Sequence, residues 1–535
     1  GATLAAEVTK NDRARLQGCR KYGTTAADSF YTHDIIDQGL ATTADNSGTR
    51  ASSATAGYIG RVTYDYAGKY LAEVMARVDG SYIYAPGYRW GVFPAYSLGW
   101  RISEENFFKQ ALPFVNNLKF RWSDGFTGAV QGSAYAYIAG YTSSGSYIFS
   151  DGTTTPGFSS NTVENTLLSW AKVRMMDFGI DWEMWHGKFG GSFDWFKRIT
   201  DGIAATRTVS LPDFYGVSLP QENLNVMENE GLELSLYTSG SIGQFNYRIT
   251  GSATYARSRM TYIESENGKG YNSSMSYWKS STLNRWSNAR SASLYEWAGG
   301  QFTSLDYISN LGVLYDTNKA NAGNRDMVPG MYNLVDRNGD GYITGDDMFY
   351  TWSDDNPPLQ FGLTFSGNYK NFDFSLVFSG ASLKSKSLGL SSYAGFGYLY
   401  QLPKMFTKDC WSVQNYGDDP WDPNTEWNSG YWPALARVSQ VGGSHNVTYT
   451  SNQPYNFIDA TYLRLKTIEV GYRFSPEFIR KIGIKSLRVY FNGGNLFTLC
   501  NKNLRFVDPE SQDYGRQGGS FQINRSFSFG LNLNF

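Results

Sequence analysis

The chain has 535 residues and a formal net charge of −1, a balance that points away from nucleic acid as a partner. Charged residues make up only 18% of the chain, and no apolar run reaches the roughly 18 residues that a membrane-spanning helix needs. Aromatic residues account for 16%, and richness in Tyr and Gly suits β-hairpins and the aromatic girdles of membrane barrels. The three cysteines lack metal-ligand spacing and indicate no disulfide framework.

Alternation of apolar and polar residues predicts antiparallel strands along the chain. Phe193 and Trp195, for example, alternate with Ser192 and Asp194. The predicted strands are 57–66, 70–81, 89–102, 117–125, 170–185, 188–200, 226–238, 244–260, 357–368, 372–384, 460–474, 485–499 and 521–535, thirteen in all. Residues 1–8 are a candidate for one more strand.

The connections between the predicted strands fall into two length classes. The short ones are Gly68-Lys69, 103–116, His186-Gly187, 239–243, Tyr369-Lys370-Asn371 and 475–484. The long ones are 126–169, 201–225, 261–356, 385–459 and 500–520. Outer-membrane barrels sort their connections in this way, with short periplasmic turns and long extracellular loops.

Two predicted strands carry further detail. Within 460–474 the apolar phase changes between Leu465 and Ile468, which predicts a β-bulge. In 521–535 only Arg525 interrupts strict alternation, with polar residues at the even positions. The odd-numbered residues, which we expect to face the membrane, are Phe521, Ile523, Phe527, Phe529, Leu531, Leu533 and Phe535. An apolar outer face and a polar inner face are typical of a barrel with a wet lumen.

These patterns predict an all-β fold, a transmembrane antiparallel β-barrel. Thirteen or fourteen strands leave two sheet edges, and unpaired backbone groups in lipid cost several kcal/mol each. We therefore expect the remaining strands to come from sequence outside this chain or from another chain. The chain opens at Gly1 without Met or an export signal, so we also expect a removed signal or a longer polypeptide.

A series of short motifs gives the barrel a more specific interpretation. They are Tyr58-Ile59-Gly60-Arg61-Val62-Thr63-Tyr64-Asp65-Tyr66, Gly68-Lys69-Tyr70-Leu71, Arg77-Val78-Asp79-Gly80-Ser81, Arg89-Trp90-Gly91-Val92-Phe93-Pro94, Gly99-Trp100-Arg101-Ile102-Ser103-Glu104-Glu105, Asn117-Leu118-Lys119-Phe120-Arg121, Asn229-Glu230-Gly231-Leu232-Glu233-Leu234, Tyr462-Leu463-Arg464-Leu465-Lys466 and Gly494-Asn495-Leu496-Phe497-Thr498. In their order and spacing they resemble the SusC-like, TonB-dependent transporters of Bacteroidetes outer membranes.

The resemblance implies that 1–535 is the C-terminal portion of a barrel of about 22 strands whose lumen is plugged. It implies that the N-terminal plug and the segment that contacts TonB are not part of this chain. It further implies energy-dependent import of large nutrients, usually oligosaccharides or other glycans and sometimes peptides. The expected partners are a SusD-like surface lipoprotein, TonB, the substrate and outer-membrane lipid, without nucleic acid.

The segment 336–347 follows the calcium-loop pattern, with oxygen-bearing side chains at its positions 1, 3 and 5, Gly at 6 and a carboxylate at 12. The predicted Ca²⁺ ligands are Asp336, Asn338, Asp340, the Tyr342 carbonyl and Asp347. Asp347 stands where the pattern normally has Glu, and its shorter side chain reaches a cation less well. A bound Ca²⁺ would order the loop. The alternative is a Gly/Asp-rich turn without metal, and SusC-like proteins often carry such a stretch.

Aromatic residues in two long loops are candidates for contact with a substrate or a partner, because flat apolar faces with a polar edge suit sugar rings. The candidates are Trp278, Trp286, Trp297, Trp421 and Trp427. Packing within the loops is the alternative. The resemblance assigns structural roles to Trp411 and Trp432.

Residues with catalytic spacing are not evident. The three histidines, His33, His186 and His445, accompany no nucleophile motif, and the carboxylates form no spaced acid/base pair. We therefore expect a transporter of the outer membrane and not an enzyme. A passive porin-like channel and a surface carbohydrate-binding β-protein are the alternatives. A plug domain would exclude the first, and a need for detergent would exclude the second.

Overall fold

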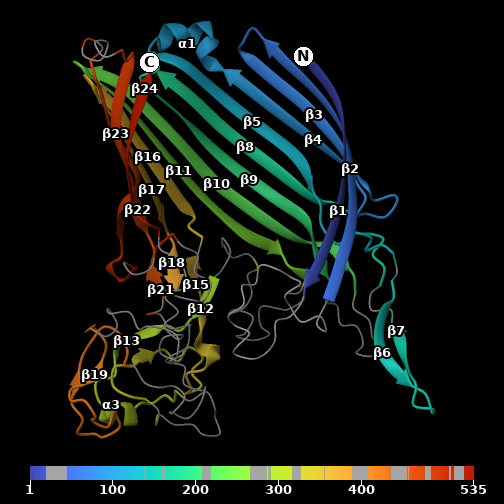
Figure 1. Cartoon of the computed structure of the whole chain (residues 1–535), viewed down its shortest axis with the longest axis vertical. Coiled ribbons are helices and arrows are strands. Elements are labelled where there is room, and N and C mark those ends of the chain that lie inside the picture. Colours follow the sequence, from blue (N-terminus) through green and yellow to red (C-terminus); the bar gives the residue numbers. More distant parts are fainter. Residues whose placement is uncertain are drawn as a thin grey trace. The chain divides into compact units, whose positions relative to one another are not determined.

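The computed structural model describes most of the chain. The described residues are 1–19, 45–138, 140–159, 163–207, 219–264, 283, 286, 291–315, 324, 327–354, 356–387, 408–434, 455, 457–475, 477, 483–504, 508–510 and 523–534. They are mainly β-strands with a few short helices (Figure 1), so the predicted all-β class is confirmed. Among these residues, no helix is long and apolar enough to cross a membrane.

Fourteen strands form one large antiparallel sheet, in which each strand lies beside the next sheet strand along the chain. The strands are β1 (Ala2–Cys19), β2 (Asp45–Tyr66), β3 (Tyr70–Ser81), β4 (Trp90–Arg101), β5 (Val115–Ala129), β8 (Ala171–Met184), β9 (Phe189–Thr206), β10 (Gln221–Ile242), β11 (Phe245–Tyr262), β16 (Leu359–Tyr369), β17 (Phe372–Ser382), β22 (Tyr462–Arg473), β23 (Ser486–Cys500) and β24 (Ser526–Asn534). All thirteen predicted strands are present, and β1 is the additional strand that residues 1–8 suggested.

Several strand boundaries differ from the prediction. β2 begins at Asp45 instead of residue 57, because 45–56 is rich in Ser, Thr, Ala and Gly and gives no period-two signal. β24 begins at Ser526 instead of residue 521. Its pairing with β23 ends at Gly494, next to an irregularity in the pairing of β23 with β22.

The short connections lie where the sequence predicted them. β16 and β17 are joined by Lys370-Asn371, with Lys370 at a φ of 50°. The turn between β8 and β9 contains His186 and Gly187, both with positive φ, the conformation that tight hairpins favour. The connection from β4 to β5 holds a 3-10 helix, η4 (Ile102–Glu104), and α1 (Asn106–Ala111). One turn is shorter than predicted, since β10 continues to Ile242.

The predicted bulge in 460–474 is confirmed. Val377 of β17 pairs with Thr467 of β22, and the next residue, Phe378, pairs with Leu465. Lys466 is therefore the extra residue of the bulge. Because paired residues of neighbouring strands share a face, Thr467 lies on the polar face of the sheet and Leu465 on the apolar face.

The chain divides into two compact units. The first comprises Gly1–Leu98, Ser123–Met175 and Thr200–Asn225. Its small core contains Tyr84, Phe93, Leu168 and Trp170, and the Trp170 Nε1–H donates to the carbonyl of Arg89 at 3.0 Å. The predicted long loop 126–169 contains a hairpin in this unit, β6 (Thr142–Ile148) with β7 (Thr154–Ser159).

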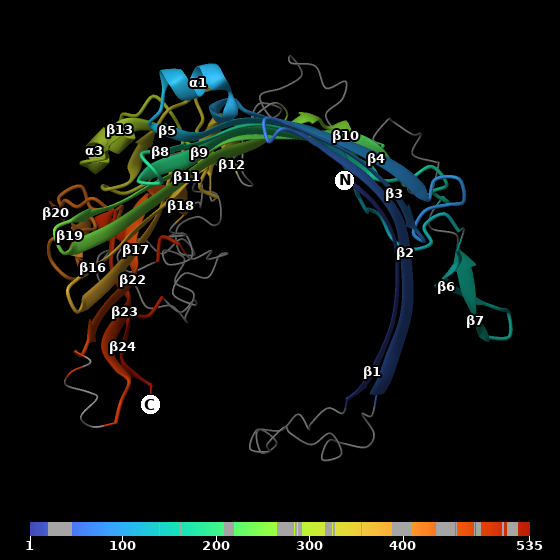
Figure 2. The ribbon, with the colours of Figure 1, turned by 90° about the horizontal axis from the view of Figure 1, so that it is seen from above.

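The second unit comprises Gly99–Trp122, Met176–Ile199 and Val226–Phe535. In it, β16, β17, β22, β23 and β24 follow one another in the sheet (Figure 2). Its long connections also hold short elements: β12 (Ser291–Leu294) pairs with β15 (Phe349–Asp354), β13 (Trp297–Gln301) with β14 (Tyr332–Leu334), β18 (Ser385–Ser387) with β21 (Phe457–Asp459) and β19 (Ser412–Val413) with β20 (Trp427–Asn428). The helices are α3 (Leu305–Ser309), η8 (Gly345–Asp347) and η12 (Lys502–Leu504).

The long connections of the second unit have a hydrophobic core of their own, which we call the loop core. Its buried residues are Tyr295, Phe302, Ile308, Tyr315, Met327, Val328, Met331, Tyr332, Leu334, Ile343, Trp411, Trp432, Ala434, Tyr455, Ile458, Ala460 and Leu504. Three connections that are far apart in the sequence contribute to it. The predicted long loops are therefore a folded body in this unit.

Candidate functional site

The last strand has the two faces that its sequence predicted. Phe529 is 81% exposed and pairs with Phe491 of β23, whereas Ser528 pairs with Asn492. The other described apolar residues on the exposed face are Ile523, Phe527, Leu531 and Leu533, and Phe521 and Phe535 lie outside the described residues. An apolar face that is this exposed needs an apolar environment.

The polar face carries ion pairs that span three strands. Arg488 of β23 donates from Nε to both carboxylate oxygens of Asp373 on β17, at 3.1 and 3.0 Å. Its Nη2 donates to Oε1 of Glu469 on β22 at 2.6 Å. The guanidinium group crosses β22 at Gly471, where a Cβ atom would lie 2.5 Å from the Arg488 Nε. Any larger residue at position 471 would displace the guanidinium group, so the bridge in this geometry requires glycine on the middle strand.

The same arrangement recurs on β5, β8 and β9. Arg121 of β5 donates to Asp181 of β8 at 2.8 Å and to Asp194 of β9 at 2.7 Å. It crosses β8 at Gly179, where a Cβ atom would lie 2.6 Å from the Arg121 Nη2. These contacts are invisible in single strands, because each joins residues that are at least 19 positions apart.

A third charged cluster holds the short segment Asp508–Glu510. Arg464, 2% exposed, donates to the Asp508 carboxylate at 2.7 Å and lies against Glu510 at 2.5 Å. Lys384 donates to the Pro509 carbonyl at 2.8 Å, and Lys386 to the Asp508 carbonyl at 2.9 Å. Sequence reasoning missed this clamp, since its members come from one strand and two connections and carry no local motif.

The calcium-type loop forms a compact turn in which the candidate ligands accept hydrogen bonds from the backbone. Asp336 accepts from Gly339 and Gly341, both at 2.8 Å. Asn338 accepts from the Asp340 N–H at 3.0 Å, and Asp340 accepts from Tyr342 at 2.9 Å.

Asp347 closes the calcium-type loop from inside. Its side chain is fully buried and accepts from the Arg337 N–H at 3.0 Å and the Thr344 N–H at 2.6 Å. Burial raises the pKa of the Asp347 carboxyl group above its ordinary value, against the opposing effect of these hydrogen bonds. Within the described part of the chain, no three His, Cys, Asp or Glu residues gather into a metal-binding group. The loop geometry by itself is that of a self-capped turn.

The candidate aromatic residues divide between packed and exposed positions. Trp286 stacks on the Arg259 guanidinium, 4.2 Å from the ring centroid. Trp297 is 47% exposed, and Trp421 is 42% exposed. Trp427 packs against the loop core. Trp278 lies outside the described residues.

The two tryptophans to which the resemblance assigned structural roles are buried. Trp411 and Trp432 belong to the loop core, and the Trp411 Nε1–H donates to Gln301 at 3.0 Å. Trp297 and Trp421 are therefore the described candidates that are most accessible to a substrate or partner.

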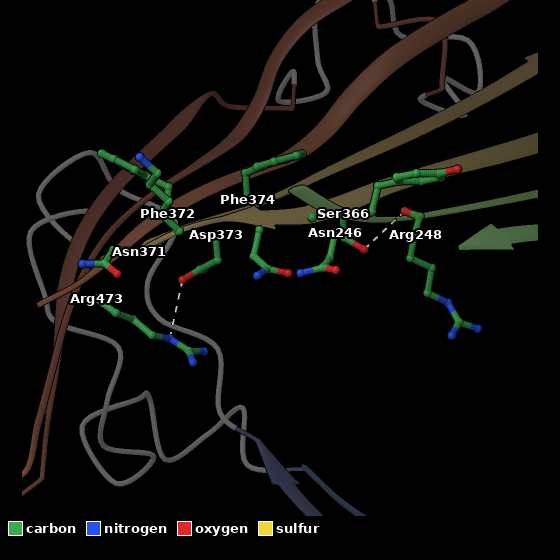
Figure 3. Close-up of a pocket in the computed structure, with 12 residues that line it drawn as sticks. Asn246, Arg248, Ser366, Asn371, Phe372, Asp373, Phe374 and Arg473 are labelled. Carbon is green, nitrogen blue, oxygen red and sulfur yellow. Dashed lines mark hydrogen bonds and ion pairs between the residues drawn. The ribbon is translucent and has the colours of Figure 1, made fainter. Parts of the chain in front are cut away.

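A polar pocket lies where β11, β16, β17 and β22 approach the β16–β17 turn (Figure 3); we call it the turn-end pocket. Its volume is about 560 Å³. The lining residues are Asn246, Tyr247, Arg248, Ser366, Gly367, Asn368, Lys370, Asn371, Phe372, Asp373, Phe374 and Arg473. Sequence reasoning missed this pocket, because β11, β16 and β17 contribute three residues each, the β16–β17 turn two and β22 one, and no local motif connects them.

Comparison with known proteins supports the barrel interpretation. No protein-family model matches the chain. It is 26% identical over 527 residues to the TonB-dependent receptor P3 of Formosa agariphila, which covers 95% of this chain and 48% of that protein. It is 26% identical over 484 residues to the TonB-dependent receptor SusC of Bacteroides thetaiotaomicron, covering 89% of this chain and 43% of that protein. The chain thus spans about half the length of the curated relatives it matches.

Solved structures share the fold. The RagAB peptide transporter superposes with a TM-score of 0.70 at 17% identity, covering 100% of this chain and 53% of the other. The RagAB peptide importer in the open-open state gives a TM-score of 0.69 at 18% identity. The resemblance of this chain to the SusC-like TonB-dependent receptors, and with it an outer-membrane location, is therefore confirmed.

Proposed function

We propose that the chain forms part of the wall of an importer that carries large nutrients across the outer membrane, with energy supplied through TonB. The observation that carries the proposal is similarity to TonB-dependent receptors along 95% of the chain, together with a matching fold. The exposed apolar face of β24 supports it, because a barrel in lipid needs such a face. The polar face with its ion pairs is then the lumen wall.

Further strands have to complete the barrel in this proposal. β1 and β24 are the two end strands of the sheet. In lipid, the unpaired backbone groups of an end strand cost several kcal/mol each, so both ends require partners. Strands elsewhere in the same polypeptide or in a second chain would supply them, and a plug would fill the lumen.

A SusD-like surface lipoprotein is the proposed partner on the outer side. If the hairpin turns lie in the periplasm, the loop core lies outside the cell. Trp297 and Trp421 then offer exposed aromatic surface for such a lipoprotein or for a substrate. The proposed substrates are oligosaccharides or peptides, and peptides are the cargo of the RagAB transporter.

A structural Ca²⁺ in the loop 336–347 is part of the proposal. Asp336, Asn338, Asp340, Asp347 and the Tyr342 carbonyl are hard oxygen donors of the type that Ca²⁺ prefers. Each carboxylate oxygen that accepts one backbone hydrogen bond retains a second lone pair. A bound cation would neutralise the buried Asp347 carboxylate and stabilise the loop.

Uptake in the native host tests the function. The gene that encodes this chain is deleted, and growth is measured on single glycans or peptides as the sole nutrient. We expect loss of growth on one substrate class, and the same loss when TonB is inactivated. Growth that depends on the gene but not on TonB would favour the passive channel. Release of the protein from membranes by high salt without detergent would favour the surface-binding protein.

The partner is tested by purification in mild detergent through an affinity tag. We expect a lipoprotein to co-purify in a stoichiometric amount. The alanine variants of Trp297 and Trp421 should weaken this association while the barrel stays folded. Purification of the protein alone as a closed, ion-conducting pore would contradict the transporter function.

A further inference from the structure

The turn-end pocket has more positive than negative charge. Arg248, Lys370 and Arg473 contribute cations, and Asp373 is its single carboxylate. Figure 3 shows Asn246, Arg248, Asp373 and Arg473 projecting to the same side of the sheet. This is the polar face, since Asn246 pairs with Asn368 of β16, and Asn368 with Asp373 of β17.

The carboxylate in the pocket already has a partner. Arg488, which is not among the lining residues, donates to both oxygens of Asp373. Arg473 is 3.8 Å from the same carboxylate, beyond hydrogen-bond distance, and its side chain is 73% exposed. The negative charge of Asp373 is therefore neutralised mainly by Arg488. Its interaction with Arg473 is weaker, so Arg473 can pair with a further anion.

The other two cations each lie over an aromatic ring. The Arg248 guanidinium lies 5.4 Å from the ring centroid of Tyr237. The Lys370 ammonium lies 5.5 Å from the ring centroid of Tyr369. In the described part of the chain, neither forms an ion pair with a carboxylate. Both can still donate charge-assisted hydrogen bonds.

Amide groups complete the set of donors. Asn246 and Asn368 are register neighbours, and Asn371 lies in the adjoining turn. Guanidinium groups bind carboxylates through two parallel hydrogen bonds, and amides add neutral donors around them. A volume of about 560 Å³ is that of a ligand pocket and exceeds the need of a single small anion.

We propose that the turn-end pocket binds an acidic polypeptide segment, with Arg248 and Arg473 donating to its carboxylates and Asn246 and Asn368 to its neighbouring polar groups. Such a segment would supply the negative charge that the pocket lacks. The inference rests on the proposed lumen position of the polar face. It does not require that the substrate be known.

Photo-crosslinking tests the proposal in native membranes. p-Benzoylphenylalanine replaces Asn371, which lines the pocket but is not one of the four proposed donors, the membranes are irradiated, and the crosslinked segment is sequenced by mass spectrometry. We expect a polypeptide adduct with Asp or Glu close to the crosslink. The same spectrum identifies whether the segment belongs to this polypeptide or to another.

Charge variants test whether the crosslink depends on the cations of the pocket. Arg248→Gln with Arg473→Gln should lower the adduct yield at least about tenfold, the loss expected for one charge-assisted hydrogen bond. Lys188→Gln with Arg525→Gln removes two exposed cations elsewhere and should leave the yield unchanged. The single variant Arg248→Lys, which keeps the positive charge, should give a higher adduct yield than the single variant Arg248→Gln. Folding is checked for every variant by heat-modifiable gel mobility.

Three outcomes would overturn the proposal: no polypeptide adduct, an adduct without acidic residues nearby, or equal losses in the two double variants. An adduct with lipid alone would also place the pocket on the wrong face. The readout is a crosslink and not uptake, so failure of this proposal and failure of the transport function are separable.

Discussion

Arg488 on β23 and Asp373 on β17 form an ion pair across an entire intervening strand, passing over Gly471 of β22. Glu469 of β22 accepts from the same guanidinium group. One side chain therefore links three strands. The polar side chains of this face connect the strands of the sheet as well as facing water.

Arg488→Met should destabilise the protein by about 1–3 kcal/mol, because it leaves two partly buried carboxylates without their donor. Urea unfolding in mild detergent measures the loss. A double-mutant cycle with Asp373→Asn should show coupling, since the two side chains share hydrogen bonds. Arg525→Met is the control, as Arg525 is exposed. Equal destabilisation by both Met variants would contradict the bridge.

A charge should destabilise β24 far more on its apolar face than on its polar face. Phe529→Arg should cost about 2–4 kcal/mol if the residue faces lipid near the bilayer midplane, and Ser528→Arg should cost far less. Refolding into liposomes at graded urea concentrations gives both values. Equal costs would reject the assignment of the odd-numbered residues to the membrane.

Arg464→Met should be among the most damaging changes in the charged clusters. Arg464 is 2% exposed, and its removal leaves Asp508 with a buried carboxylate and no guanidinium partner. Breaking such a buried pair costs about 3–5 kcal/mol. Lys502→Met removes an exposed cation nearby in the chain and should be neutral within about 0.5 kcal/mol. Unfolding in urea compares them, and a neutral Arg464→Met would show that the clamp does not contribute.

The loop core should depend on Trp432 and not on Trp421. Trp432→Ala empties a buried site and should cost about 3–5 kcal/mol, whereas Trp421 is 42% exposed and its alanine variant should leave stability nearly unchanged. Limited proteolysis, with fragments mapped to 291–347 and 408–434, reports loss of the loop core separately from the sheet. Equal resistance of the two variants to proteolysis would argue against a packed loop core.

The Asp347 carboxyl group should make the loop less stable as the pH rises. Burial raises its folded-state pKa above the unfolded value of about 3.9, so the folded state binds the proton more tightly. The contribution of this proton to the stability of the folded loop is complete below the unfolded-state pKa of Asp347. It is lost as the pH rises through the folded-state pKa.

Melting curves in EGTA test this dependence on Asp347. Relative to Asp347→Asn, the wild-type loop should lose stability as the pH rises above the unfolded pKa of about 4. Added Ca²⁺ should reverse the loss at pH 7 if the loop binds it. A pH-independent difference between the two proteins would contradict the burial effect, and no response to Ca²⁺ would contradict the proposed metal site.

Local periodicity was enough to locate the strands, but it could not predict the side-chain contacts that connect one strand to another. The bulge at Lys466 and the faces of β24 follow from the side chains of a single strand. The partners of Arg488 lie on two other strands, and those of Arg464 in a separate loop, so their pairing depends on strand order and register. The loop core is invisible for the same reason, as its aromatic residues come from connections with no periodic signal.

Gly471 and Gly179 have a consequence for strand pairing. A slip of β22 by one residue would place Val470 or Tyr472 beneath the Arg488 guanidinium and turn Glu469 to the other face of the sheet. A slip of β8 would do the same to Arg121 and Asp181. Backbone hydrogen bonds are nearly indifferent to such a shift, whereas these bridges form in one alignment alone. They therefore favour the native register over its one-residue neighbours.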